Sequence, residues 1–308
     1  MFDQLQSLTT EQRNPRSRKI DAMAIPDILR VINEEDGRVP AAVAKELPHI
    51  GRAVKLVVGA FKSGGRLIYV GAGTSGRLGI LDAAECPPTF GTDPKMVRGI
   101  MAGGPEAVFQ SKEGAEDNEP DGKRAIIRMR VGPKDVVCGI AASLRTPFVI
   151  GAITAAKKRK AKTIYVTANS RKVLQQPRYG SLRKCLDVAI CLEVGPEVIM
   201  GSTRMKAGTA QKLVLNMITS ASMIQMGKVY ENMMVDLKMN SRKLEERAKK
   251  VLMLSTGVNY ETAAEKLVEA DWNVKTAIVM IKKRLTKREA QKLLRARGGF
   301  VRRAIGGK

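Results

Sequence analysis

The stretch Leu67-Ile-Tyr-Val-Gly71-Ala-Gly73-Thr-Ser-Gly76-Arg decides the fold, because it joins a short apolar strand to a helix through a glycine-rich turn. Its glycines stand at the G-x-G-x-x-G spacing that follows the first strand of dinucleotide-binding sheets. In such a turn the backbone N–H groups at the start of the helix face a bound anion. The stretch therefore predicts a parallel α/β sheet with an anion site at its first turn.

This turn has two interpretations. A dinucleotide site also needs an acidic residue at the end of the second strand to hold the ribose. The candidate second strand, Met96–Met101, is followed by Ala102-Gly-Gly104 and offers no acid there. The hydroxyl groups of Thr74 and Ser75 within the turn suit a single phosphate. We therefore favour a phosphate ligand over a dinucleotide.

Strands and helices alternate through the middle of the chain, which is typical of βαβ units. Further strands are expected at 135–141, 163–167 and 188–194, and helices at about 76–84 and 147–159. A long helix follows, with one apolar stripe made of Val214, Met217, Ile218 and Ala221. We expect Pro87-Pro88 to stop the helix that begins near residue 76. Before the glycine-rich turn, helical patterns cover 25–34 and about 41–63.

The fold class that follows is a three-layer, doubly wound, mostly parallel α/β sheet with helical segments at both ends of the chain. We predict an N-terminal helical segment at 1–56, an α/β ligand-binding domain at 57–237 and a small C-terminal helical domain at 238–308. In the last of these, Asp271 is expected to cap one helix. Thr286-Lys-Arg-Glu289 has the pattern of a capping box that opens another.

The composition is that of a globular protein, with 44% hydrophobic residues in 308. The N-terminus lacks the apolar segment of a signal peptide, and no stretch reaches the roughly 18–20 apolar residues of a membrane span. The four cysteines form no C-x-x-C pair, which argues against a zinc site and a disulfide framework. We expect a cytoplasmic protein without a membrane partner, in which carboxylates, Lys, Tyr or Cys carry any acid–base chemistry.

The formal net charge of +24 raises the question of a nucleic-acid partner. About half of the excess lies in residues 238–308, with 19 Lys/Arg against 7 Asp/Glu. These basic residues are spread along helical patterns, without interleaved aromatic residues or a nucleic-acid motif. We therefore favour a solvated basic surface over a nucleic-acid interface.

Hydroxyl-bearing loops follow two further strands. Ser143 comes after the strand at 135–141, and Ser202 and Thr203 come after the strand at 188–194. Because the carboxyl ends of parallel strands meet at one edge of the sheet, these loops should lie together with the glycine-rich turn. Ser and Thr also cap helices in any protein, but three such loops at one edge favour a cradle for a phosphorylated sugar.

Two acidic segments flank this cradle in the sequence, and they contain Glu85 and Glu116. Most glutamates are solvated surface charges. Two carboxylates beside a ligand, however, can divide the acid and base work of a reaction when their pKa values differ. We therefore treat Glu85 and Glu116 as the candidate catalytic residues.

Several segments together resemble the N-acetylmuramic acid 6-phosphate etherases, over nearly the whole chain: Thr10–Pro15, Gly71–Gly79, Glu85–Gly91, Glu113–Asn118, Gly201–Lys212 and Val235–Leu237. The chain is similar, more distantly, to the glucokinase regulatory protein. Both resemblances imply that 57–237 is a sugar-isomerase (SIS) domain. The C-terminal helices resemble a small ubiquitin-associated three-helix fold, which in this family would support a homodimer.

The resemblance also implies a reaction, in which the D-lactyl ether of the open-chain sugar phosphate is cleaved without metal or nucleotide cofactor. Glu116 would remove the proton at C2, and Glu85 would protonate the departing lactate oxygen. The residues that would hold the phosphate are Thr74, Ser75, Ser143, Ser202 and Thr203. Lys206 would either add positive charge at the phosphate or face solvent.

The sequence departs from the family pattern at Leu144, where a glycine is usual, and at Met200, where a threonine is usual. If position 144 needs a positive φ, leucine would strain the loop and change the contacts to the sugar. Two other functions use the same domain and stay open at this point. One is a non-catalytic SIS module that senses a sugar phosphate, and the other is an aldose–ketose isomerase.

Overall fold

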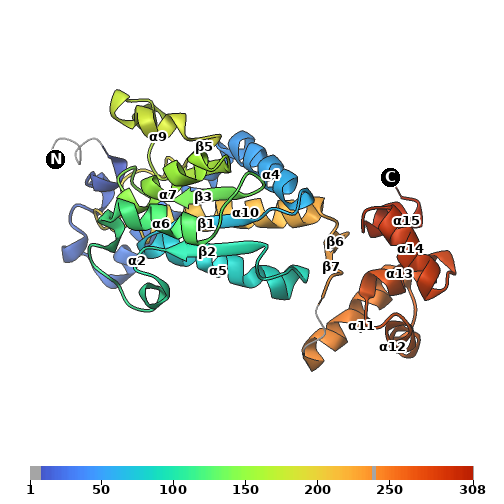
Figure 1. Ribbon diagram of the computed structural model, residues 1–308. Helices are drawn as coiled ribbons and strands as arrows, with labels where there is room; N and C mark the ends of the chain where they lie inside the picture. Colours follow the sequence, from blue (N-terminus) through green and yellow to red (C-terminus); the bar gives the residue numbers. More distant parts are fainter. Residues whose placement is uncertain (1–7, 238–240, 308) are drawn as a thin grey trace. The chain divides into compact units, whose positions relative to one another are not determined.

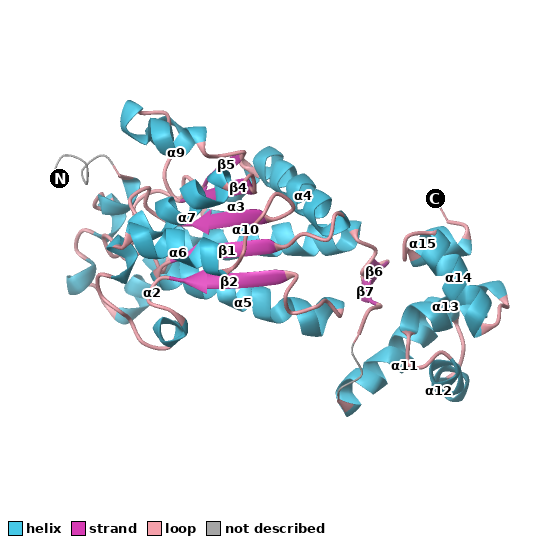
Figure 2. Cartoon of the chain, viewed as in Figure 1, coloured by secondary structure: helices cyan, strands magenta, loops and turns pink. Residues whose placement is uncertain are grey.

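The computed structural model describes residues 8–237 and 241–307. A parallel five-stranded sheet lies at the centre of residues 8–237 (Figure 2). The strand order is β2-β1-β3-β4-β5, and every neighbouring pair is parallel. The strands are β1 (Leu67–Gly71), β2 (Val97–Met101), β3 (Val136–Ile140), β4 (Lys162–Thr167) and β5 (Val188–Cys191). The predicted parallel sheet is confirmed.

Helices cover both faces of this sheet, as the buried strands require. On one face, α6 (Glu119–Arg128) and α7 (Pro147–Lys158) pack with side chains such as Ile68 and Val137 in one apolar cluster. On the other face lies α5 (Gly73–Phe90), where Gly79 approaches the side chain of Tyr69. The remaining large helices are α4 (Leu47–Lys62) and α10 (Lys206–Gln225) (Figure 1). The doubly wound arrangement is therefore confirmed.

The helical patterns before the glycine-rich turn form three helices: α2 (Ile25–Asp36), α3 (Val39–Ala44) and α4. The pattern predicted as one helix over 41–63 is divided at Lys45-Glu46. Pro48 stands in the first turn of α4, where its missing N–H costs nothing. In a continuous helix its ring would clash with the carbonyl group of Ala44, so the chain starts a new helix instead.

The prediction that Pro87-Pro88 stops the helix is wrong, because α5 continues to Phe90. Proline has a φ close to the helical value, and only two residues of α5 follow Pro88, so the lost hydrogen bonds and the crowding of the proline rings are confined to the end of the helix. The helix ends instead at Gly91, whose φ is +61° and whose N–H donates to the Pro87 carbonyl at 2.9 Å.

The chain divides into two compact units. The first holds the residues up to Ala84 and Lys95–Thr219, and the second holds Glu85–Pro94 and the residues from Ser220 onward. The chain thus passes between the units within α5 and α10. The predicted boundaries 1–56, 57–237 and 238–308 remain a prediction, and the one after 237 adjoins residues 238–240, which lie outside the described part.

The second unit contains a two-stranded antiparallel sheet and a set of helices around their own apolar core. Its elements are β6 (Val229–Tyr230), β7 (Met233–Met234), α11 (Arg242–Thr256), α12 (Tyr260–Glu269), α13 (Val274–Lys283), α14 (Lys287–Ala296) and α15 (Val301–Ile305). The predicted capping box between Thr286 and Glu289 is present. The predicted cap at Asp271 is wrong: Asn273 caps α13, and Asp271 has a φ of +50°.

Short elements complete the description: η1 (Thr9–Glu11), η2 (Pro15–Ser17), η3 (Ile20–Ala22), η4 (Pro105–Val108), η5 (Ala115–Asp117), α8 (Arg171–Leu174), η6 (Pro177–Tyr179) and α9 (Gly180–Lys184). Among the described residues, no helix is long and apolar enough to cross a bilayer.

The close crossing of α6 and α7 gives a prediction about stability. A Cβ atom on Gly122 of α6 would lie 1.9 Å from the carbonyl oxygen of Phe148, so the helices would have to separate. We expect Gly122→Ala to lower the free energy of unfolding by about 1–3 kcal/mol in urea denaturation. Gly51→Ala in α4 is the control: its Cβ would meet no atom within 4 Å. It should stabilise the protein by about 0.5–1 kcal/mol.

Candidate active site

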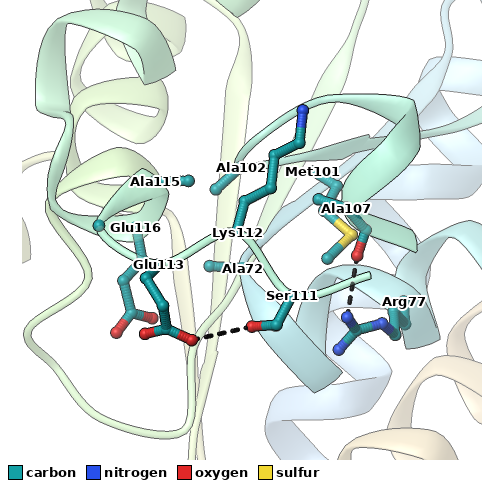
Figure 3. A pocket seen from close by; sticks show the side chains of 12 residues that line it. Ala72, Arg77, Met101, Ala102, Ala107, Ser111, Lys112, Glu113, Ala115 and Glu116 are labelled. Atoms are coloured by element: carbon teal, nitrogen blue, oxygen red, sulfur yellow. Dashed lines mark hydrogen bonds between the residues drawn. The ribbon is translucent and has the colours of Figure 1, made fainter. Parts of the chain in front are cut away.

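A pocket of about 190 Å³ opens at the carboxyl ends of β1 and β2 (Figure 3). Its lining residues come from the glycine-rich turn, the end of β2 and the segment from η4 to η5: Ala72, Gly73, Arg77, Met101, Ala102, Ala107, Ser111, Lys112, Glu113, Gly114, Ala115 and Glu116. In parallel α/β sheets, this edge is where ligands bind. The structure thus brings the predicted base Glu116 and the predicted anion-binding turn into one pocket.

Glu116 has the electrostatic setting of a carboxylate base. It stands on η5, next to Ala115, which packs against the apolar cluster beneath α7. Although its side chain remains exposed, the surrounding protein desolvates the carboxyl group and raises its pKa above the usual value. The negative charges of Asp117 and Glu113 raise the pKa further. A raised pKa makes the carboxylate a stronger base.

The glycine-rich turn leaves three N–H groups at the start of α5 without an acceptor. Within the described chain, Gly76 N–H donates to the Ala72 carbonyl at 3.2 Å, whereas the N–H groups of Gly73, Thr74 and Ser75 meet no protein acceptor. The turn is tight because a Cβ on Gly71 would lie 2.6 Å from the nitrogen of Gly76. Free amides at a helix N-terminus attract an anion, and here they stand beside the pocket.

The glycine-rich turn and the loop after β5 both approach Gly208 of α10. A Cβ on this glycine would lie 3.3 Å from the Thr74 methyl carbon and 3.5 Å from the Thr203 carbonyl oxygen. In addition, the Ser75 hydroxyl donates to Gln211 of α10 at 2.9 Å. Ser75 is therefore held by the protein, and it can offer a ligand its backbone N–H. The hydroxyl groups of Thr74, Ser202 and Thr203 make no hydrogen bond to any residue of the described chain.

Ser143 stands at the carboxyl end of β3, the strand next to β1 in the sheet. Its hydroxyl accepts a hydrogen bond from the Arg145 N–H at 3.4 Å. The strain considered for Leu144 is not present: its φ is not positive, and its side chain is 1% exposed within the main apolar cluster. Met200, the other departure from the family pattern, is 55% exposed.

Lys206 does not face solvent, so that alternative is wrong. The residue is 1% exposed, and its ammonium group lies 2.5 Å from a carboxylate oxygen of Glu35. Glu35 was not among the residues singled out from the sequence. The signal that could have found it is a glutamate at the end of an otherwise amphipathic helix, on the face that packs inward.

Arg77 lines the pocket and was also not singled out from the sequence. Its guanidinium donates to the carbonyl groups of Val108 at 2.8 Å and Ala107 at 2.9 Å. It thereby ties η4 to the first helix after the turn and shapes one wall of the pocket. Glu85, the predicted acid, is exposed near the end of α5 and belongs to the second compact unit. Its role stays a prediction.

Several known proteins resemble this chain over much of its length. The family model described as the glucokinase regulatory protein N-terminal SIS domain matches residues 49–157. An N-acetylmuramic acid 6-phosphate etherase of Salinibacter ruber is 57% identical over 308 residues, which cover 100% of this chain and 96% of the relative. An N-acetylmuramic acid 6-phosphate etherase of Shouchella clausii is 50% identical over 301 residues, 98% of this chain and 99% of the relative.

A solved structure, the phosphoheptose isomerase of Neisseria gonorrhoeae, superposes with a TM-score of 0.45 at 18% identity and covers 65% of this chain and 98% of its own. The full-length identities of 57% and 50% are far beyond those of proteins that share only a fold. On this ground the chain belongs to the N-acetylmuramic acid 6-phosphate etherase family.

Proposed function

We propose that this chain is a carbon–oxygen lyase that cleaves the D-lactyl ether of N-acetylmuramic acid 6-phosphate. The products are N-acetylglucosamine 6-phosphate and D-lactate, and the reaction serves the catabolism or recycling of cell-wall sugars. The observation that carries the proposal is the placement of Glu116, with its raised pKa, in one pocket with the free N–H groups of the glycine-rich turn. Family membership supports it independently.

The reaction divides into an elimination and a hydration. In the open-chain aldehyde the proton at C2 is acidic because the neighbouring carbonyl group stabilises the carbanion. Glu116 takes this proton and leaves an enolate, whose electron pair then forms the C2–C3 double bond as the C3–O bond breaks. The lactate oxygen leaves with a proton from Glu85. Water then adds to C3 of the unsaturated aldehyde, and C2 takes back a proton.

Binding of the substrate's phosphate group orients the sugar so that C2 lies near Glu116. Its oxygens would accept hydrogen bonds from the backbone N–H groups at the start of α5, where the helix dipole also favours negative charge. The side chains proposed to hold it are Thr74, Ser143, Ser202 and Thr203, with Ser75 contributing through its N–H. Binding energy from the phosphate, remote from the reacting bond, is used to orient the substrate.

The test is incubation with N-acetylmuramic acid 6-phosphate and assay of D-lactate, with unphosphorylated N-acetylmuramic acid as the control substrate. We expect lactate from the phosphorylated sugar and little from the control. Binding of the sugar phosphate without lactate would point to a sensor, and interconversion of aldose and ketose phosphates would point to an isomerase. A salt-sensitive gel shift with duplex DNA would show that the basic surface has a nucleic-acid partner.

A homodimer is part of the proposal, because parallel-sheet domains of this kind commonly complete their sites with a second copy. Light scattering at micromolar concentration should give twice the mass of the 33.6 kDa chain. A monomeric mass would contradict this. The cytoplasmic location also remains a prediction.

A further inference from the structure

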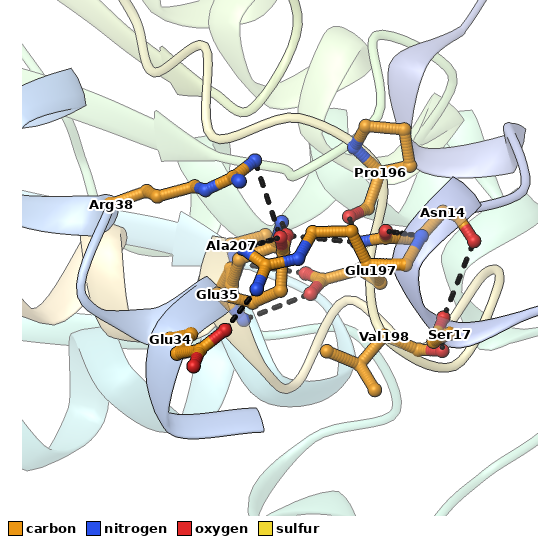
Figure 4. Close-up of polar contacts among 11 residues, drawn as sticks. Asn14, Ser17, Glu34, Glu35, Arg38, Pro196, Glu197, Val198 and Ala207 are labelled. Atoms are coloured by element: carbon orange, nitrogen blue, oxygen red, sulfur yellow. Dashed lines mark hydrogen bonds and ion pairs between the residues drawn. The ribbon is translucent and has the colours of Figure 1, made fainter. Parts of the chain in front are cut away.

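The loop between β5 and α10 carries Ser202 and Thr203, and buried contacts tie it to the N-terminal segment (Figure 4). The Gly201 N–H donates to the carbonyl oxygen of Thr10 at 3.1 Å. The Ser17 hydroxyl donates to the carbonyl oxygen of Val198 at 2.7 Å. The shape of this loop therefore depends on a part of the chain about 180 residues away, since the Ser17–Val198 pair is separated by 181 positions.

Glu35 is the centre of this network. Its Oε2 accepts a hydrogen bond from the Lys206 ammonium at 2.5 Å and from the Asn14 amide at 2.8 Å, and its Oε1 lies 3.2 Å from a guanidinium nitrogen of Arg38. The Asn14 amide also donates to the Pro196 carbonyl at 3.0 Å. Glu35 is thus joined to the start of the loop through Asn14 and to its end through Lys206.

Burial by itself would raise the pKa of Glu35, but the hydrogen bonds from Lys206 and Asn14 and the nearby positive charges outweigh it and hold the pKa below its usual value. Glu35 is therefore a carboxylate at neutral pH. Its side chain and that of Lys206 are each 1% exposed, so the pair is screened from solvent.

The first turn of α10 is already occupied by protein groups. The Glu197 carboxylate accepts hydrogen bonds from the N–H groups of Lys206 at 3.0 Å and Ala207 at 2.9 Å, and the Gly208 N–H donates to the Thr203 carbonyl at 3.0 Å. The hydroxyl groups of Ser202 and Thr203, in contrast, remain available to an anion at this loop. Their position follows from the course of the loop.

We propose that the buried Glu35–Lys206 ion pair is a positioning device, which fixes the loop so that Ser202 and Thr203 meet the phosphate opposite Thr74. Lys206 does not itself contact the substrate, because its ammonium group is buried and already paired. This inference rests on the proposed function, in that Ser202 and Thr203 are taken as phosphate ligands.

Replacing both partners of the pair at once is the change expected to keep the protein folded. Deleting one partner would leave a buried, unpaired charge, which is strongly destabilising, whereas replacing both with apolar side chains of similar size is often neutral. The test protein is therefore the double variant Glu35→Leu with Lys206→Met. The control is Glu34→Leu on the same helix as Glu35, which removes an exposed ion pair with Arg16 of η2.

The measurement is the kinetics of D-lactate release, together with the Kd of N-acetylglucosamine 6-phosphate and the melting temperature. For the double variant we expect KM and Kd to rise about tenfold, kcat to stay within about threefold, and the melting temperature to change by a few degrees. The Glu34→Leu control should keep the native KM. Unchanged KM and Kd in the double variant would overturn the proposal.

A mutant cycle that combines Ser202→Ala with the double variant tests whether the ion pair positions the loop or Lys206 contacts the substrate directly. If the ion pair acts through the loop, Ser202→Ala should raise KM in the native protein and have little further effect in the double variant. Full additivity would mean that Lys206 contributes independently of the loop, and the proposal would be wrong. If the native protein binds N-acetylglucosamine 6-phosphate but releases no lactate, the etherase function fails, and the same cycle in Kd still decides the positioning role.

Discussion

Replacing Glu116 by glutamine is expected to lower kcat for D-lactate release by about 10²–10⁴-fold, because the amide cannot accept the proton at C2. The shape of the pocket should be kept, since glutamine has nearly the same volume and the side chain makes no hydrogen bond in the described structure. The measurement is initial-rate kinetics with N-acetylmuramic acid 6-phosphate. Incorporation of deuterium at C2 from heavy water should be lost in parallel.

Glu113→Gln is the matched control. This neighbour also lines the pocket, but its carboxylate is engaged with the Ser111 hydroxyl at 3.2 Å (Figure 3). We expect kcat within about threefold of native. Removing the Glu113 charge also removes one of the causes of the raised pKa of Glu116. If Glu113→Gln were as damaging as Glu116→Gln, the base would be misassigned or shared.

The pH dependence of kcat/KM should reveal the ionisation of Glu116. Glu116 must be ionised to act as a base, and its pKa is raised by desolvation and by Asp117 and Glu113. Activity should therefore fall on the acid side at a pH above the ordinary glutamate pKa of about 4.3. In Glu113→Gln this acid limb should move to lower pH, because one like charge is gone. An acid limb at the ordinary value would contradict the base assignment.

Glu85→Gln is expected to reduce lactate release by about 10²–10⁴-fold as well, for a different reason. The departing lactate oxygen is a poor leaving group without a proton, whereas removal of the C2 proton does not need Glu85. Deuterium exchange at C2 should therefore persist in Glu85→Gln although the ether bond stays intact. A substrate whose C3 leaving group needs no proton, such as a halide, should restore much of the rate.

Glu116→Gln and Glu85→Gln should give opposite results for deuterium exchange at C2. This measurement therefore decides which glutamate is the base and which is the acid. If Glu85→Gln loses C2 exchange and Glu116→Gln keeps it, the two roles are reversed. If both variants release lactate at the native rate, neither glutamate acts as proposed. Asp82, one turn before Glu85 on α5, is buried and bonded to the hydroxyl groups of Tyr69 and Thr219, so it is not a suitable control.

The sequence allowed the sheet and its ligand-binding edge to be predicted, because both follow from local patterns. Short apolar runs between amphipathic helices predict strands, and a glycine-rich turn after the first strand indicates where an anion can bind. Helix ends were less predictable. Pro87-Pro88 looked like a stop, yet the helix continues for two more residues to Phe90, because the cost of the two prolines falls only on its end.

The environment of Lys206 could not be predicted, because it depends on a residue far away in the chain. Its partner Glu35 is 171 positions distant, and no local pattern in the sequence links the two residues. The fit of Leu144 could not be decided from the sequence for a related reason. A family glycine suggested a positive φ, but the backbone does not need one here, and the apolar cluster accommodates the larger side chain.

The contacts between the N-terminal segment and the loop after β5 also bear on how the protein is made. The Asn14–Pro196 bond joins residues 182 positions apart. At a translation rate of about 5–20 residues per second, the segment waits roughly 10–40 s for its partner to be synthesised. The segment therefore leaves the ribosome well before the loop and docks late, and the proposed phosphate site can be completed only after the loop has been made.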